Sequence, residues 1–381
     1  MKKNGWLSVF AFCSVIGTPT YAENVDNLLV DAAAFQKDLQ GIRTDLYTLR
    51  NRTGLSAQVT NYGAKLVTLI VPDRNGVPAD IVMGYDNIDR YLTANPNFGS
   101  TVGRYANRIS NASFTLDGAT YTLTKNDGDN TLHGGNKSFR HVVWQATRID
   151  DSTVAFTYYS KDGEEGYPGN LNVRVVYALT DNNELRIEYQ ATTDKPTVLN
   201  LTNHSFFNLA GHGNGDVLGQ LLEVNASGYT RVKAGFIPTG EIVPVAGTPM
   251  DFRKPTPVGA RIRDDYPELR MPATPGYDQN FVLDKKPGQL SFAARVTDPK
   301  SGRVMELFTT EPGLQVFSGQ NSNGAGGFVG KRGVPYNVYS SLCLEPQHFP
   351  DSPNRPEFPS TVLRPGEWYS QTSAYRFSTT R

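Results

Sequence analysis

The stretch of sequence that decides the fold class lies at residues 114–123 and reads FTLDGATYTL. Apolar and polar side chains alternate on both sides of Asp117-Gly118, as they do in strands that have one buried face. Asp-Gly is a two-residue turn that favours a β-hairpin. The stretch therefore predicts two antiparallel strands, at residues 114–116 and 119–123.

Similar alternation recurs along the chain at residues 154–159, 173–179, 185–189 and 303–309. The 36 glycines, 24 prolines, 19 tyrosines and 19 phenylalanines suit many short strands that are joined by tight turns. A short helix is expected at residues 30–39, where three alanines favour it and Gly41 ends it. Apart from this helix, the sequence predicts an all-β fold.

The chain shows neither a fixed-period repeat nor a low-complexity linker, which favours one all-β domain. Residues 249–275 are rich in proline, arginine and aspartate. They are expected to form a long loop rather than a domain linker, because strand-like sequence resumes at Phe281. The single domain is expected to span residues 23–381.

The first 22 residues have the order of a secretory signal peptide. Lys2 and Lys3 precede an apolar run from residue 6 to residue 17, and small residues follow up to Ala22. The run is shorter than the roughly 20 residues that a membrane-spanning helix needs. We expect cleavage after Ala22 and a monomeric, periplasmic mature protein that has crossed the inner membrane and keeps no membrane anchor.

Charge and cysteine content narrow the class of partner. The 37 basic and 37 acidic residues cancel, and no block of like charge stands out, so the sequence has no electrostatic footprint for nucleic acid or an anionic membrane. A small neutral molecule is the expected partner. Cys13 lies in the predicted signal peptide, so the mature chain keeps only Cys343 and cannot form an internal disulfide.

Motif searches leave acid–base catalysis as the remaining chemistry. The five histidines form neither a His-x-His nor a His-Glu-x-x-His pair, which gives a zinc site little support. The chain has no Gly-x-Ser-x-Gly elbow, no Walker loop and no dinucleotide fingerprint after a strand. We therefore expect neither a metal nor a cofactor.

Residues 198–209 alternate with period two, so their side chains fall on two faces of a strand. One face is apolar and carries Leu199, Leu201, Phe207 and Leu209, whereas the other carries Asn200, Thr202, His204, Phe206 and Asn208. A rigid strand is a good support for a proton donor at His204. The alternative is a structural histidine that is hydrogen-bonded within a β-sheet.

Residues 340–345 alternate in the same way. Leu342 and Leu344 lie opposite Cys343 and Glu345, and Pro346 is expected to end the ladder pairing. Glu345 would then lie at the end of a strand, where it is either a general base or an ordinary exposed glutamate. Cys343 lacks cationic neighbours in the sequence, so we interpret it as a packing residue.

Other polar residues could bind hydroxyl groups. Asn107 and Arg108 lie in GRYANRI at residues 103–109, His133 lies in LHGG at residues 132–135, and Asp278 precedes a strand. Each signal is weak alone. Together they predict a cleft with hydrogen-bonding groups, in which aromatic side chains could stack on the apolar face of a sugar.

These motifs and their order resemble those of the galactose mutarotase (aldose 1-epimerase) family, from about residue 49 to residue 375. Besides the two motifs just quoted, they are NYGA at 61–64, VPD at 71–73, LTNH at 201–204, GYD at 276–278, EPGLQ at 311–315, LEPQ at 344–347 and LRPGE at 363–367. A set of motifs in family order is far more specific than any one of them. Members of the family often have a different residue after the glutamate, where this chain has Pro346. This difference affects only the local path of the chain.

The resemblance implies a large antiparallel β-sandwich whose concave sheet holds a free aldohexose. It implies that Glu345 is the base and His204 the acid, with no metal or cofactor. The sugar-binding residues would be Asn107, Arg108, His133, Asp278 and Gln315. Since such chemistry needs a charged glutamate and a protonated histidine, the carboxylate of Asp278 is expected to favour the histidinium.

Three rival functions stay open at this point. A non-catalytic sugar-binding protein would use the same cleft, and the pairing of Glu345 with His204 is the feature that discriminates against it. A glycosidase needs two carboxylates about 5 to 10 Å apart, for which Glu311 or Asp278 could partner Glu345. A hexose-6-phosphate epimerase of the same superfamily is expected to carry extra arginines near the site.

Overall fold

The structure is a computed structural model that describes residues 1, 21–39, 41–94, 97–320 and 328–380. Most of the predicted signal peptide, residues 2–20, lies outside the described residues. The first described element is the helix α1 (Tyr21–Asp26). In these described ranges no helix has both the length and the apolar character that a membrane crossing requires.

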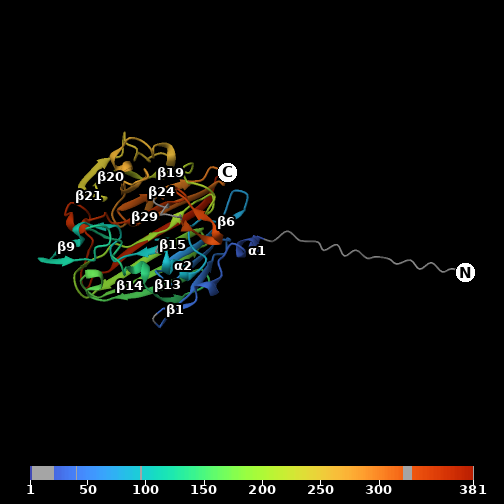
Figure 1. Cartoon of the computed structure of the whole chain (residues 1–381), viewed down its shortest axis with the longest axis horizontal. Coiled ribbons are helices and arrows are strands. Elements are labelled where there is room, and N and C mark those ends of the chain that lie inside the picture. The colour runs from blue at the N-terminus through green and yellow to red at the C-terminus, as the bar shows by residue number, and fades with distance from the viewer. Residues whose placement is uncertain (2–20, 40, 95–96, 321–327, 381) are drawn as a thin grey trace.

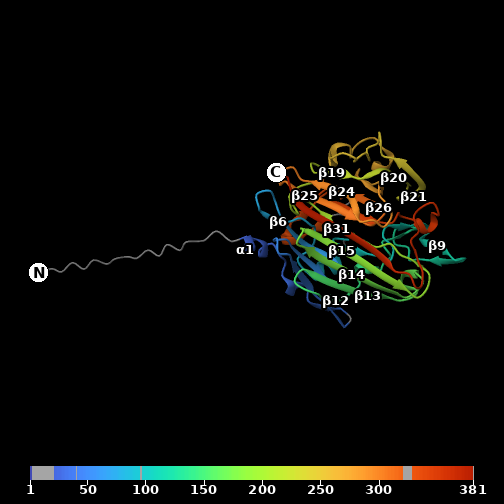
Figure 2. The same cartoon turned by 180° about the vertical axis from the view of Figure 1, so that it is seen from behind.

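Two large antiparallel sheets form the body of the molecule, as Figures 1 and 2 show from opposite sides. The nine-stranded sheet contains, in spatial order, β12 (Gln145–Arg148), β13 (Thr153–Ser160), β14 (Leu171–Thr180), β15 (Glu184–Thr193), β31 (Tyr369–Thr379), β25 (Arg303–Thr309), β24 (Ser291–Thr297), β19 (Leu221–Val224) and β22 (Thr256–Pro257). The six-stranded sheet contains β18 (Phe206–Phe207), β29 (Leu342–Gln347), β26 (Gly313–Phe317), β23 (Asp278–Leu283), β20 (Ala226–Lys233) and β21 (Ile237–Pro244).

Smaller elements surround the two large sheets. A four-stranded sheet contains β3 (Leu46–Arg50), β4 (Ser56–Thr60), β5 (Lys65–Pro72) and β6 (Pro78–Asp80). The two-stranded pairs include β1 (Lys37–Leu39) with β2 (Ile42–Thr44), β7 (Ser100–Val102) with β17 (Thr202–His204), β8 (Arg108–Ile109) with β11 (Thr131–Leu132), β9 (Ser113–Leu116) with β10 (Ala119–Thr122), β16 (Thr197–Val198) with β30 (Val362–Leu363), and β27 (Phe328–Val329) with β28 (Pro335–Tyr336). Helical elements are short, such as α2 (Ile88–Thr93) and the 3₁₀ turns η1 (Ala32–Phe35) and η3 (Phe139–His141).

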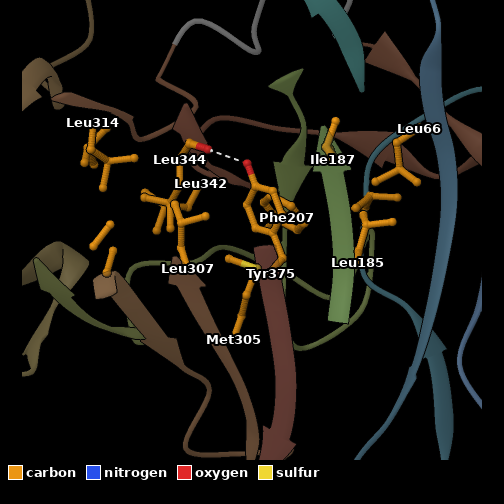
Figure 3. Close-up of a cluster of buried hydrophobic side chains, with 14 of the residues drawn as sticks. Leu66, Leu185, Ile187, Phe207, Met305, Leu307, Leu314, Leu342, Leu344 and Tyr375 are labelled. Carbon is orange, nitrogen blue, oxygen red and sulfur yellow. Dashed lines mark hydrogen bonds between the residues drawn. The ribbon is translucent and has the colours of Figure 1, made fainter. Parts of the chain in front are cut away.

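The core lies between the two large sheets and depends on the alternation of side chains along the strands. Leu342 and Leu344 of β29 pack with Met305 and Leu307 of β25 in one buried cluster (Figure 3). Tyr375 of β31 crosses this cluster and donates its hydroxyl to the carbonyl oxygen of Leu344, 3.1 Å away. Because neighbouring side chains of β29 point to opposite faces, burial of its leucines directs Glu345 away from this core.

The strand predictions are confirmed except at residues 198–209, which form parts of three short strands, β16, β17 and β18, in three different sheets instead of one strand. The hairpin at residues 114–123 appears as β9 and β10, and its turn residues Asp117 and Gly118 have φ angles of 50° and 81°. These positive values are what a two-residue hairpin turn requires. The alternating segments appear as β13, β14, β15 and β25, and the all-β antiparallel class is correct.

The helix expected at residues 30–39 is wrong. The chain forms only the 3₁₀ turn η1 and then the strand β1. The hydroxyl of Thr44 donates to the carbonyl oxygen of Phe35 at 2.6 Å, and an α-helix would need that carbonyl for the N–H of residue 39. Pairing with β2 therefore overrides the helix preference of the three alanines.

The long excursion before the strand at Phe281 is confirmed, although it holds the short strand β22 and the 3₁₀ turns η5 (Val258–Ala260) and η6 (Pro267–Arg270). The strand that follows, β23, begins at Asp278, three residues earlier than Phe281. The single domain at residues 23–381 stays a prediction.

Candidate active site

One cavity of about 260 Å³ brings together all seven site residues that the sequence predicted. Its lining contains His204 and Glu345, together with Asn107, Arg108, His133, Asp278 and Gln315. These residues are up to 238 positions apart in the sequence, since they run from Asn107 to Glu345. Only the tertiary fold can collect them, so their convergence is a structural result.

Neighbouring strands of the six-stranded sheet present the acidic wall of the cavity. Glu345 of β29 lies directly opposite Gln315 of β26 in the strand register, and Asp278 opens the next strand, β23. The side-chain amide of Gln315 donates to Asp278 Oδ1 at 2.6 Å, and Gln347 Nε2 donates to Gln315 Oε1 at 3.4 Å. This chain of hydrogen bonds fixes the carboxylate and amide groups before any ligand binds.

The position predicted for Glu345, at the end of a strand and limited by Pro346, is wrong. β29 continues through Pro346 to Gln347, and Glu345 is only 2% exposed. β18 pairs with Leu342 and Cys343 only, so at Pro346 the strand has a partner on one side alone. A residue without an N–H is tolerated there. Glu345 is therefore held by a paired strand rather than by a loop.

His204 and Glu345 form the closest acid–base pair in the cavity. Nε2 of His204 lies 3.6 Å from Oε1 of Glu345, and both side chains are buried. The imidazole stacks on the ring of Phe206, with ring centres 4.7 Å apart and planes 7° from parallel. Glu345 Oε2 is buried and has no hydrogen-bond partner among the described residues. A buried acceptor that faces a cavity is a natural site for a ligand hydroxyl.

Two residues with left-handed backbone form the opposite wall. Asn107 has a φ of 65° and His133 a φ of 52°, and such conformations cost of the order of 1–3 kcal/mol in residues other than glycine. The backbone N–H of Asn107 donates to Nδ1 of His133 at 3.1 Å. A neutral ring whose Nδ1 accepts carries its proton on Nε2. His133 is therefore a hydrogen-bond donor through Nε2.

Arg108 is held in place from outside the cavity. Its Nε donates to Oδ2 of Asp127 at 2.7 Å, and its guanidinium lies over the ring of Phe236, 5.0 Å from the ring centre. The side chain is 12% exposed. These contacts restrain the guanidinium. Arg108 lines the cavity, and the remaining N–H groups of its guanidinium can still donate hydrogen bonds to a ligand.

Burial perturbs the pKa values of the acid–base pair in opposite directions. It raises the pKa of Glu345 well above its ordinary value, and the nearby charge of Asp278 adds to this effect. Burial also lowers the pKa of His204 to about 3, and the charges of Arg140 and Lys65 lower it further. The prediction that Asp278 favours the histidinium is thus wrong. Its carboxylate acts mainly on Glu345, because both lie on the acidic wall.

These pKa shifts leave one proton on the pair over a wide pH range. A neutral Glu345 with a neutral His204 holds the same number of protons as a carboxylate with an imidazolium, so the two forms are tautomers. In the protein alone, burial favours the form in which both groups are neutral. A single proton shared by two groups is suited to reversible proton transfer.

Comparison with known proteins identifies the family of this arrangement. A family model described as aldose 1-epimerase matches residues 45–376. The chain belongs to the aldose 1-epimerase family. Galactose mutarotase from Bos taurus is 42% identical over 324 residues, which cover 85% of this chain and 91% of that protein. Aldose 1-epimerase from Escherichia coli (strain K12) is 38% identical over 352 residues, 92% of this chain and 99% of that protein.

The solved structure of the aldose epimerase homologue from C. elegans agrees with this fold at a TM-score of 0.81. It is 33% identical, and the match covers 89% of this chain and 100% of that one. As a member of the aldose 1-epimerase family, the chain is an isomerase.

Ring-nitrogen and carboxylate atoms of His133, His204 and Glu345 lie within 4.8 Å of one another, close enough to consider a metal ion. The histidines do not fit that role. Nδ1 of His133 accepts from Asn107, which leaves the proton on the Nε2 that would have to bind the ion. Nδ1 of His204 is buried without the hydrogen-bond acceptor that usually orients a metal-binding histidine. The geometry suits three groups around substrate hydroxyls better than a metal.

Two of the rival functions lose part of their structural support in this epimerase site, although Asp278, the other candidate for the second carboxylate of a glycosidase, does line the cavity with Glu345. Glu311 does not line the cavity and instead pairs with Nδ1 of His348 at 2.6 Å, so it is not the second carboxylate of a glycosidase. Among the described residues that line the cavity, Arg108 is the one arginine, which is poor support for a phosphate site.

Six further lining residues, four of them aromatic, were not assigned to the site from the sequence. The residues missed are Asn97, Phe98, Leu132, Phe206, Phe317 and Phe328. Two of them carried a readable signal, because Phe206 follows His204 by two residues and Phe317 follows Gln315 by two, on the same strand faces. Phe98 and Phe328 come from distant segments and have no such local signal.

Proposed function

We propose that this chain interconverts the α and β anomers of a free aldohexose, such as galactose or glucose, through acid–base opening of the sugar ring. The observation that carries this proposal is the separation of 3.6 Å between Nε2 of His204 and Oε1 of Glu345 in a cavity that is also lined by hydroxyl-binding groups. One sugar can contact both groups at once, as general acid–base catalysis requires.

The proposed reaction conserves protons and needs no redox step. Glu345 removes the proton from the hydroxyl on the anomeric carbon while His204 donates a proton to the ring oxygen, and the bond between that carbon and the ring oxygen breaks. The open-chain aldehyde turns about its first carbon–carbon bond. Ring closure returns each proton by the reverse path and leaves the opposite anomer.

The remaining cavity residues would hold the sugar. The tautomer that reacts is the charged one, with a Glu345 carboxylate and a His204 imidazolium. The sugar favours this tautomer, because its hydroxyl groups donate to Glu345 and its ring oxygen accepts from His204. Nε2 of His133 is a fixed hydrogen-bond donor. It would donate to an oxygen of the sugar that lies close to the ring oxygen. The rings of Phe206 and Phe317 supply apolar surface for the sugar face.

The direct test is polarimetry of freshly dissolved α-D-galactose and α-D-glucose with the purified protein. We expect the approach to the equilibrium rotation to be faster in proportion to protein concentration, with an unchanged end point. A rate equal to that of buffer alone, from folded protein with both sugars, would reject the proposal.

Arg108→Ala is expected to raise KM. A hydrogen bond to a charged group contributes about 1.5–3 kcal/mol, which corresponds to roughly 10- to 100-fold in kcat/KM. If the contact is equally strong in the ground and transition states, kcat stays unchanged, whereas a fall in kcat means that Arg108 also orients the sugar. Steady-state polarimetry separates the two constants. Unchanged values of both would remove Arg108 from the sugar site.

The pH profile of kcat/KM is expected to be bell-shaped, since the active form holds one proton. Rate is lost in acid as the pair binds a second proton, and it is lost in alkali as the last proton leaves. Because the pKa of His204 is lowered to about 3, the acid limb should lie well below the ordinary imidazole value of 6.5. The raised pKa of Glu345 should place the alkaline limb above the ordinary carboxyl value of 4.5. An acid limb at or above pH 6.5 contradicts this assignment.

We also propose that the mature protein is a periplasmic monomer that begins near Glu23. The support is the order of Lys2, Lys3, the apolar run and Ala22 in the sequence. N-terminal sequencing of protein from the producing cell should find Glu23 or a close neighbour first, in the periplasmic fraction. Recovery of activity from the cytoplasm with Met1 intact would refute export. A light-scattering mass well above one chain would refute the monomer.

A further inference from the structure

Two buried cations act on His204 from outside the set of residues that line the cavity. Arg140 belongs to η3 and is 8% exposed, and Lys65 begins β5 and is 1% exposed. Nη1 of Arg140 donates to Oδ1 of Asn97, which lines the cavity. Nζ of Lys65 donates to Oγ of Ser100 at 2.6 Å. Ser100 is the register partner of His204 in the β7–β17 pair.

The backbone of Arg140 and the side chain of Lys65 approach each other at Gly63. A Cβ atom at this glycine would lie 2.4 Å from the carbonyl oxygen of Arg140 and 2.8 Å from Cε of Lys65. The close approach of η3 and β5 therefore requires glycine between them, and its φ of 70° independently favours glycine. This packing brings η3 and β5 together next to β7, the strand that pairs with the strand of His204.

Arg140 has no carboxylate to compensate its charge within the described part of the chain. Its Nε is buried without a hydrogen-bond partner, and the phenol of Tyr62 is the one acidic group that acts on it. Burial lowers the pKa of Arg140 only to about 10, so the guanidinium keeps its charge at neutral pH. Lys331, in contrast, is buried in an ion pair with Asp80. An unpaired buried charge lowers the stability of the folded protein. Its presence here therefore suggests a role in function.

We propose that Arg140 is a positioning residue of the proposed epimerase reaction, which acts through His204 by driving the imidazolium proton toward the ring oxygen of the sugar. The inference rests on the proposed function. A fixed positive charge near the ring makes the imidazolium a stronger acid. It also stabilises the negative charge that develops on the ring oxygen as the carbon–oxygen bond breaks.

The other charged and titratable groups around His204 do not replace this effect. Glu345 faces it from β29, His133 from the loop after β11, and Lys65 acts on it from β5, while Asp278 and Arg108 also line the cavity. Burial is the main cause of the lowered pKa of His204, and Arg140 is the largest charge that contributes. The same guanidinium lowers the pKa of His133, Lys65 and His141.

Arg140→Gln tests the proposal because it removes the charge and keeps a hydrogen-bond donor for Asn97. We expect the acid limb of the pH profile to move to higher pH by about one unit, the order expected for one nearby charge, because protonation of His204 becomes easier. Arg140→Lys should restore the position of the profile. Arg364→Gln, which removes an arginine from an exposed pair with Asp117, should leave the profile unchanged.

A second measurement is independent of turnover. In an NMR titration of the ring protons, assigned with His204→Asn, His204 of the unsubstituted protein should titrate below pH 6.5, and Arg140→Gln should raise its midpoint. If the midpoint of a folded Arg140→Gln protein does not rise, or if His204 of the unsubstituted protein titrates at or above pH 6.5, the role of Arg140 is refuted. If the midpoint rises but no mutarotation is found with any sugar, only the proposed function fails.

Discussion

Glu345→Gln should lower kcat for mutarotation by roughly two to four orders of magnitude, the usual range for loss of a general base or acid. The amide has nearly the same shape as the carboxylate and can take its place on β29 at the cavity wall. It cannot accept the proton of the anomeric hydroxyl. Replacement also removes the cost of a buried acid whose pKa is already raised by burial, so the fold should persist.

Polarimetry on folded protein measures this loss, and calorimetric binding of galactose shows that the cavity is intact. Glu241→Gln is the matched control, because Glu241 is an exposed carboxylate that pairs with Arg231 on the surface. It should keep the rate of the unsubstituted protein. If Glu345→Gln kept near-normal mutarotation while it bound galactose, Glu345 would not be the base, and Asp278, on the same wall, would be the next candidate.

The strand pattern could be predicted because each strand is half buried and its alternation is local. β25 begins and ends at the residues where the alternating segment does, and the Asp117-Gly118 turn specifies its hairpin without help from the rest of the chain. The region around Phe35 could not be predicted in this way. Its path depends on a hydroxyl nine residues further on, and the helix preference of three alanines is too weak to oppose it.

The site shows the same division between local and tertiary information. His204 and Glu345 could be placed on the polar faces of strands by period two, and the family motifs named their partners. The state of their protons could not be predicted. It depends on how deeply they are buried, on the charge of Asp278 in the case of Glu345, and on the charge of Arg140 in the case of His204. Tertiary packing of η3 against β7 brings Arg140 into this region. Sequence reasoning therefore found the groups that the cavity brings together but assigned the wrong electrostatic role to Asp278.

His204→Asn is expected to lower kcat to a similar degree, roughly two to four orders of magnitude. Without a proton delivered to the ring oxygen, the carbon–oxygen bond must break to a free alkoxide, which is a poor leaving group. Asparagine keeps a polar group of similar reach above Phe206 but cannot give up a proton at neutral pH. Binding of galactose should survive, since His133 and the wall of Asp278 and Gln315 remain.

The double variant that combines His204→Asn with Glu345→Gln tests whether His204 and Glu345 act together in one proton relay. Groups that act on the same proton path are far from additive, so the double variant should be little slower than the slower single variant. Its polarimetric rate is to be compared with the product of the two single losses. A rate that equals this product would show independent effects, and His204 would then be a binding residue beside Glu345 rather than the acid of the reaction.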